Sequence, residues 1–330
     1  MSEDARPLPE PSWFLYRGTG TPMIPTERDR RWPAPPAWRA FAGVPHEPSP
    51  PPDDVTATRV LGPVEVPWPA APDEVMRVNT ALRLRRPLLV SGGPGTARSA
   101  VAHRVARELG LGRVLRWRVT GASTLGDALY GPAGGGTIRL GPLGTALLPH
   151  RLPRVLLVDG LDRGGFDLPE QVLGVLEDGE FTVPELLNRT ETGAGTAVVH
   201  TWETGGTATL RDALVRCHEP PFVVITTGNE ADLSPACDQQ CVPLVLPALT
   251  TGQLTALALA RFPTMAEEPH ARMLAALVER LLRTADIDAP GTLLDVLHLL
   301  DGGALGETWE GNEVEAALDA AWRWAAVEGP

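Results

Sequence analysis

Two short apolar runs constrain this chain most strongly, because neither shows the alternation of a half-exposed strand. Val155-Leu156-Leu157-Val158 and Phe222-Val223-Val224-Ile225 are continuous and apolar. Such runs are typical of parallel strands that are buried on both faces of a sheet. Two further runs, 87–90 and 242–246, and the alternating segment 114–119 extend the pattern. Together with the helical spacing between them, they predict an α/β fold with a parallel five-stranded sheet. A proline inside the last run places that strand at an edge.

The segment before the sheet is rich in both proline and aromatic residues. Seventeen of the 34 prolines fall within the first 72 residues, which excludes long helices there. The same stretch carries Trp13, Phe14 and Tyr16 among other rings, which is unusual for a plain linker. We therefore interpret residues 1–57 as an extended arm that docks its rings on a surface. That surface belongs either to the same chain or to a partner.

Residues 58–248 are predicted to form the α/β domain. Residues 249–330 are predicted to form a small all-helical domain, because strand patterns end there and helical spacing recurs at 251–261, 270–283, 292–300 and 312–326. Within the α/β part, the segment 196–218 has the pattern of an inserted β-hairpin around Gly205-Gly206.

Composition excludes several classes of partner. The formal net charge is −12 and all 29 basic residues are arginine, so a broad basic surface for nucleic acid is not expected. No apolar run approaches the roughly 18 residues of a membrane-spanning helix, and no hydrophobic signal segment follows the N-terminus. Three cysteines are too few for a disulfide scaffold. These features predict a cytoplasmic protein.

A glycine-rich turn, residues 92–99, lies between a predicted strand and a helix. This is the context of a phosphate-binding P-loop, G-x-x-x-x-G-K-[ST], whose backbone N–H groups and helix N-terminus hold phosphate oxygens. The predicted nucleotide-binding residues are Gly92, Gly93, Pro94, Gly95, Thr96, Ala97, Arg98, Ser99 and Ala100. Ala97 occupies the position of a motif glycine, where it resists positive φ, and Arg98 that of the lysine. The alternative interpretation is an ordinary strand–helix turn.

Asp159 ends the apolar run 155–158. In P-loop proteins an aspartate at this position helps to hold Mg²⁺ together with a P-loop hydroxyl, which here is Ser99. The next residue is Gly160, which has no side chain for proton transfer. The alternative role for Asp159 is a helix-capping or turn residue.

Several longer segments resemble the MoxR branch of the AAA+ ATPases, in particular the bacterial subgroup found beside von Willebrand factor A-type partners. The resemblance covers about residues 58–300. It is carried by the segments Arg86 to Val90, Gly112 to Trp117, Ile138 to Pro149, Arg154 to Asp159 and Leu168 to Glu185, and by Trp13 to Gly20 in the arm. It implies a P-loop αβα sandwich with a helical lid domain, a ring of subunits that bind ATP or ADP with Mg²⁺, and remodelling of a protein partner.

The same resemblance shows departures at the positions that perform hydrolysis. Gly160 replaces the catalytic glutamate, and Gly228 stands at the water-positioning residue with Asn229 one step late. The segment Asp238-Gln239-Gln240-Cys241 lacks the family's paired arginines, and Arg283 is too early for the second sensor. Loss of a general base costs about 10²–10⁴ in rate and loss of an arginine finger about 10³–10⁵. Asp159 and Asn229 remain as candidate catalytic residues.

Three hypotheses follow. The first is a nucleotide-binding, hydrolysis-deficient regulatory or scaffold subunit, whose partner is a von Willebrand factor A-domain protein or an active AAA+ paralogue. The second is an active ATPase that uses Asp162 or Glu230, and the third is a protein-interaction module without nucleotide. Two further features of the sequence are weaker indications. Zinc binding by Cys217, His218, Cys237 and Cys241 is disfavoured by their spacing, and the loop 131–136 is a candidate for partner contact.

Overall fold

The computed structural model describes residues 11–45, 50–52, 55–62, 64, 70–93, 95–190, 195–228, 233, 235–268, 270–284 and 289–301. Its helices are α1 (Pro25–Arg31), α2 (Val55–Leu61), α3 (Pro72–Leu84), α4 (Ala100–Glu108), α5 (Leu125–Leu129), α6 (Pro142–Ala146), α7 (Leu168–Asp178), α8 (Pro184–Thr190), α9 (Pro235–Gln240), α10 (Thr251–Arg261), α11 (His270–Arg283) and α12 (Ala289–Asp301). Three short 3₁₀ helices lie at Ala37–Arg39, Leu161–Arg163 and Pro263–Ala266.

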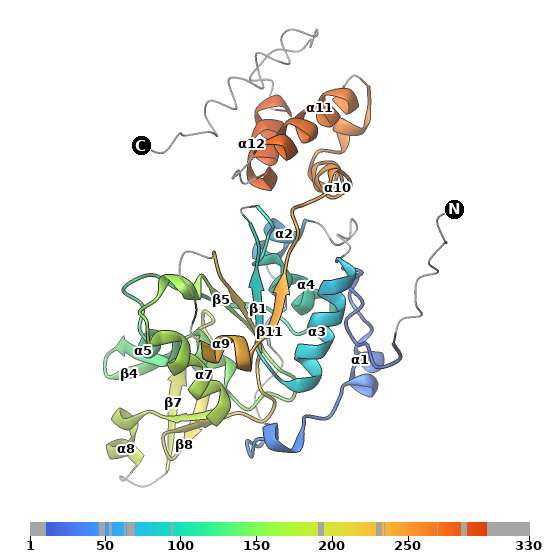
Figure 1. Cartoon of the computed structure of the whole chain (residues 1–330). Coiled ribbons are helices and arrows are strands. Elements are labelled where there is room, and N and C mark those ends of the chain that lie inside the picture. Colours follow the sequence, from blue (N-terminus) through green and yellow to red (C-terminus); the bar gives the residue numbers. More distant parts are fainter. Residues whose placement is uncertain are drawn as a thin grey trace.

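The predicted five-stranded parallel sheet is confirmed (Figure 1). Its strands are β1 (Leu88–Ser91), β2 (Leu115–Arg118), β5 (Val155–Asp159), β10 (Phe222–Thr226) and β11 (Val242–Val245), in the order β11-β1-β10-β5-β2. The proline-containing β11 lies at an edge, as predicted. It carries Pro243 there because an edge strand tolerates a missing N–H donor on its open side.

Successive residues of each strand enter two different cores, which explains why the runs are continuously apolar. Leu157 and Val224 pack in a cluster with α3, α4 and the arm. Leu156 and Val223 pack in a second cluster that includes α6 and α7. The sheet is therefore covered on both faces, as its sequence required.

A second sheet, of six strands, covers part of the face that packs against α6 and α7. Its strands are β3 (Tyr130–Gly134), β4 (Thr137–Leu140), β6 (Glu180–Thr182), β7 (Thr196–His200), β8 (Thr207–Arg211) and β9 (Leu214–Arg216), in the order β3-β4-β7-β8-β9-β6. The antiparallel β7–β8 pair confirms the predicted hairpin. The predicted loop 131–136 is instead mostly strand, because residues 131–134 belong to β3 and pair with β4, which leaves only 135–136 as the turn of the hairpin.

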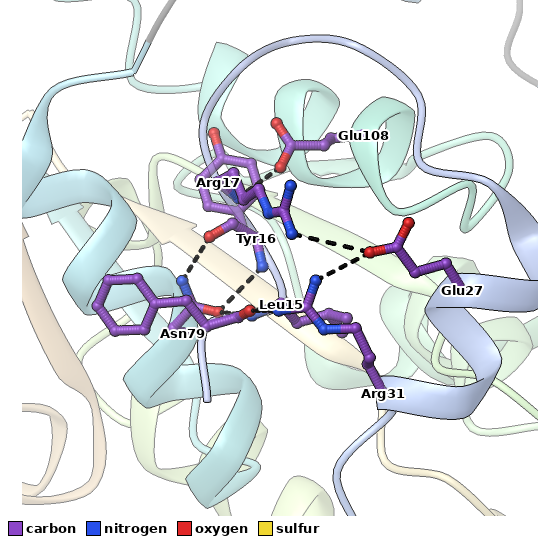
Figure 2. Close-up of polar contacts among 8 residues, drawn as sticks. Leu15, Tyr16, Arg17, Glu27, Arg31, Asn79 and Glu108 are labelled. Carbon is purple, nitrogen blue, oxygen red and sulfur yellow. Dashed lines mark hydrogen bonds and ion pairs between the residues drawn. The ribbon is translucent and has the colours of Figure 1, made fainter. Parts of the chain in front are cut away.

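The arm lies on its own chain in this structure. Phe14, Leu15 and Tyr16 are buried against α3 and α4, with 6%, 3% and 0% of their surfaces exposed. The Asn79 side chain accepts the backbone N–H groups of Leu15 and Tyr16 and donates to the Tyr16 carbonyl, at 2.7, 3.0 and 2.6 Å (Figure 2). These contacts fit the same-chain form of the docking prediction. The predicted division between residues 57 and 58 falls inside α2.

Helices α10, α11 and α12 form a separate group beyond the end of the sheet toward which β1 and β11 point (Figure 1). They share their own apolar core, which includes Leu254, Leu277 and Leu297. The predicted helix 312–326 lies outside the described residues. No helix within the described part of the chain combines the length and apolarity needed to cross a bilayer.

Candidate nucleotide site

The glycine-rich turn connects β1 to α4, and three of its described residues have a positive φ. Gly92 has φ +152°, and a Cβ there would lie 2.8 Å from the Leu246 carbonyl oxygen and from Thr96 Oγ1. Gly95 has φ +70°. Ala97 has φ +55°, so this alanine adopts the left-handed conformation that the motif normally assigns to glycine. Pro94 lies outside the described residues.

Arg98 does not extend into the space above the turn. Its Nη1 donates to the carbonyl oxygen of Gly92, so the guanidinium folds back on the loop that precedes it. The Thr96 hydroxyl likewise donates to the Gly93 carbonyl oxygen, at 2.9 Å. The turn is therefore held by two of its own side chains. A bound phosphate would have to compete with Gly92 for the Arg98 guanidinium.

Ser99 and Asp159 meet, as the sequence predicted. Ser99 Oγ donates to Asp159 Oδ1 at 3.3 Å, and Thr226 Oγ1 donates to the same oxygen at 3.0 Å. Thr226 also accepts the N–H of Gly160 at 3.0 Å, which ties the end of β10 to the end of β5. Ser99 precedes Ala100, the first residue of α4.

Arg116 completes the surroundings of Asp159, and the sequence did not assign it to the site. Its Nε donates to Asp159 Oδ2 at 3.0 Å, and its Nη2 donates to the same oxygen. The side chains of Arg116 and Asp159 are 38% and 20% exposed. Burial raises the pKa of Asp159, but the bonds from Arg116, Thr226 and Ser99 outweigh it, so the pKa lies below its usual value. Asp159 is therefore ionised at neutral pH.

The residues predicted for Mg²⁺ do not fit the ion in this arrangement. An ionised carboxylate has about four acceptor positions. Those of Asp159 are occupied by two donors from Arg116 and one each from Ser99 and Thr226. A divalent ion about 4 Å from a guanidinium would also be repelled by about 2 kcal/mol even in bulk water. Magnesium would have to displace Arg116 to reach Asp159.

Around Gly160 and Asp162, the residues that the sequence relates to hydrolysis positions, the structure shows a turn and a loop contact. Gly160 has φ +80° and begins the 3₁₀ turn Leu161–Arg163. Asp162 accepts the N–H of Gly228 at 2.8 Å, so its carboxylate binds the loop after β10. Asn229 and Glu230 lie outside the described residues. Arg283 pairs with Glu279 one turn earlier on α11, at 3.3 Å, and both side chains are 71% exposed.

Around Gln239 and Gln240 the described residues bring one arginine close. Arg86 Nη1 donates to the Gln239 carbonyl oxygen at 3.1 Å, which ends α9 rather than presenting a free guanidinium. Cys217, Cys237 and Cys241 are buried free thiols. Burial raises the pKa of Cys217 to about 12. The described residues contain no cluster of three His, Cys, Asp or Glu side chains that could hold a metal ion.

A small cavity lies beside the turn. A cavity of about 30 Å³ lies between Thr96, Leu246, Pro247 and Gln253 of α10, which is room for about one water molecule. A cavity of about 480 Å³ lies elsewhere, between the end of β2 and the β3–β4 hairpin.

The parallel sheet, the glycine turn between β1 and α4, and the carboxylate that ends β5 define an α/β fold of the P-loop type. The structure is similar over 74% of the chain to a mutant of RuvB from Thermotoga maritima, with 16% sequence identity and a TM-score of 0.46. It is similar over 73% to NtrX from Brucella abortus in complex with ADP, with 15% identity and a TM-score of 0.34.

The matched parts cover 66% and 64% of those two chains, so this chain spans just under two thirds of their length. The fold class rests on the strand order and on the turn between β1 and α4. No model of a known protein family matches the sequence, and a comparison with curated proteins finds no match.

Proposed function

We propose that the chain is a nucleotide-binding protein of the AAA+ type, similar to its MoxR branch, that hydrolyses ATP weakly or not at all. It acts as a regulatory or scaffold subunit during remodelling of a protein partner. The observation that supports this most directly is the engagement of Asp159 by Arg116, Ser99 and Thr226, with Gly160 beside it. The scaffold of a phosphate site is retained, while the groups that would activate water are replaced.

Nucleotide binding is tested by calorimetry with ADP and ATP on wild type and Ser99→Ala. We expect wild type to bind and Ser99→Ala to bind about tenfold more weakly or worse, because one hydrogen bond to a charged group is lost at the start of α4. Ser12→Ala, an exposed serine of the arm, is the matched control and should bind as wild type does. Equal binding by wild type and Ser99→Ala would contradict a site at this turn.

Turnover separates the proposal from its two alternatives. We expect ATP hydrolysis at least about 10³-fold below the 1–100 per second of ordinary phosphoryl-transfer enzymes. Turnover in the ordinary range that Asp159→Ala abolishes would establish the active ATPase instead. No nucleotide binding at millimolar concentrations would establish the nucleotide-free interaction module.

The partner is proposed to be a protein with an acidic contact surface, such as a von Willebrand factor A-type domain or an active AAA+ paralogue in a mixed ring. The 480 Å³ cavity near the β3–β4 hairpin supports this proposal. It is lined by Arg118, Arg139 and Trp202. Neither guanidinium has a hydrogen-bond or ion-pair partner among the described residues. Unpaired arginines beside a half-exposed tryptophan, here 46% exposed, are typical of protein contact sites.

An acidic peptide provides the direct test of this contact. We expect a fluorescein-labelled peptide of glutamate and phenylalanine residues to bind wild type, and the Arg118→Ala Arg139→Ala double variant to bind about tenfold more weakly. The control is Arg30→Ala Arg211→Ala, which removes the same charge from two exposed arginines elsewhere. An equal loss in both double variants would mean that net charge, rather than this cavity, binds the peptide.

A further inference from the structure

The cation that faces Asp159 in this structure belongs to the chain itself. Arg116 reaches it from β2, the neighbouring strand, where the register pairs Arg116 with Leu157 and Arg118 with Asp159. The contact is thus diagonal across two strands, which a long side chain can span. Arg118 is directly opposite Asp159 in register, but no hydrogen bond or ion pair joins its side chain to that carboxylate.

Arg116 retains donors for a further ligand. A guanidinium has five N–H groups, and those on Nε and Nη2 bond Asp159, so about three remain. Its side chain is 38% exposed. The other oxygen of the Asp159 carboxylate accepts a hydrogen bond from Ser99. This carboxylate therefore links the Arg116 guanidinium to Ser99 at the N-terminus of α4. That N-terminus is where the glycine turn would hold phosphate oxygens.

We propose that the Arg116 guanidinium takes the place of Mg²⁺ at this turn, so that nucleotide phosphates bind here without a metal ion. This inference rests on the proposed nucleotide binding and adds the chemical form of the ligand, which is the metal-free nucleotide. Arginine suits the role because its planar fork can bond a carboxylate on one edge and a phosphate on another. Asp159 orients the guanidinium and neutralises it between ligands.

Calorimetry with ADP and ATP, once in excess EDTA and once in excess MgCl₂, tests the inference on the full chain. We expect the two dissociation constants of wild type to agree within about threefold. In Arg116→Gln, binding in EDTA should weaken, and MgCl₂ should restore it by about tenfold or more, because Asp159 becomes available to the ion. Arg211→Gln removes an exposed arginine from β8, away from the turn, and should behave as wild type does.

A second readout reports the metal directly. Electron paramagnetic resonance of Mn²⁺ in the presence of ADP should show no ion bound by wild type beyond that held by free ADP, and a bound ion in Arg116→Gln. Wild-type affinity that falls tenfold or more in EDTA would overturn the inference and leave the proposed function standing. No nucleotide binding in either buffer would overturn both. Circular dichroism would show whether Arg116→Gln folds. If it does not, the comparison of wild-type binding in EDTA and in MgCl₂ still tests the inference.

Discussion

Replacing Glu74 with alanine is expected to lower the free energy of unfolding by about 3–5 kcal/mol, because it leaves the Arg104 guanidinium buried without its counter-ion. Arg104 Nε and Nη2 donate to the two carboxylate oxygens of Glu74 at 2.9 and 2.5 Å. The side chains are only 6% and 2% exposed. The Tyr16 hydroxyl donates to Glu74 Oε1 at 2.8 Å, so the substitution also removes the acceptor of an arm residue.

Urea denaturation followed by circular dichroism measures this loss. The matched control is Asp73→Ala, the preceding residue on α3, whose pair with Arg77 is exposed and spans 3.3 Å. That variant should lose about 0.5 kcal/mol or less. The double variant Glu74→Met Arg104→Met should be more stable than Glu74→Ala, because no unpaired charge remains buried. A Glu74→Ala protein as stable as the Asp73→Ala protein would show that the pair is not buried in solution.

Glu108→Gln is expected to release the arm from α4. The Glu108 carboxylate accepts four backbone N–H groups in a row, from Arg17, Gly18, Thr19 and Gly20, at 2.5, 3.2, 2.7 and 3.1 Å. Figure 2 shows the first of these bonds, from Arg17. Both glycines have positive φ, +68° and +73°, which turns successive N–H groups toward one anion. A glutamine keeps one acceptor oxygen, loses the charge, and turns an NH₂ group toward two donors.

Trypsin probes that release, because cleavage after Arg17, followed separately from cleavage at the other arginines, reports the opening of the arm. Each charge-assisted bond contributes about 1.5–3 kcal/mol. Loss of two should therefore raise the cleavage rate about a hundredfold or more, since cleavage follows the population of the open form. Mass spectrometry would identify the cut.

The control for this experiment is Glu27→Gln. Glu27 pairs with Arg17 and Arg31 at 3.7 and 3.1 Å, but its side chain is 36% exposed (Figure 2). Its loss should change cleavage only a few fold. Equal protection of wild type and Glu108→Gln would mean that the apolar contacts of Phe14 and Leu15 hold the arm without the carboxylate.

Local pattern was enough to predict most of the sheet and the helices. The strands 155–159 and 222–226 were recognised because burial on both faces demands continuous apolar residues, and α4, α10 and α11 because their apolar residues recur with helical spacing. The β3–β4 hairpin was missed because its segment is rich in glycine. Its strand character comes from the pairing of β3 with β4, and the register pair of Arg139 with His200 joins it to β7, about 60 residues later in the chain.

The candidate site also has features that the sequence predicts and one that it does not. The turn, the meeting of Ser99 with Asp159 and the absence of a side chain at Gly160 could all be predicted, because they depend on positions along the chain. The role of Arg116 could not be predicted in this way. The alternation of β2 indicates which of its residues share a face, but not which strand lies beside it or which carboxylate is within reach.

The sequence by itself therefore determined which segments form strands and helices, where the glycine-rich turn lies between β1 and α4, and that Gly160 follows Asp159. Only the tertiary structure decided that Arg116 binds Asp159, that Arg98 folds onto Gly92, and that the arm lies on α3 and α4. The physical reason is the distance over which each effect acts. Backbone preference and burial pattern act between near neighbours in the chain, whereas charged side chains select their partners by distance in the folded protein.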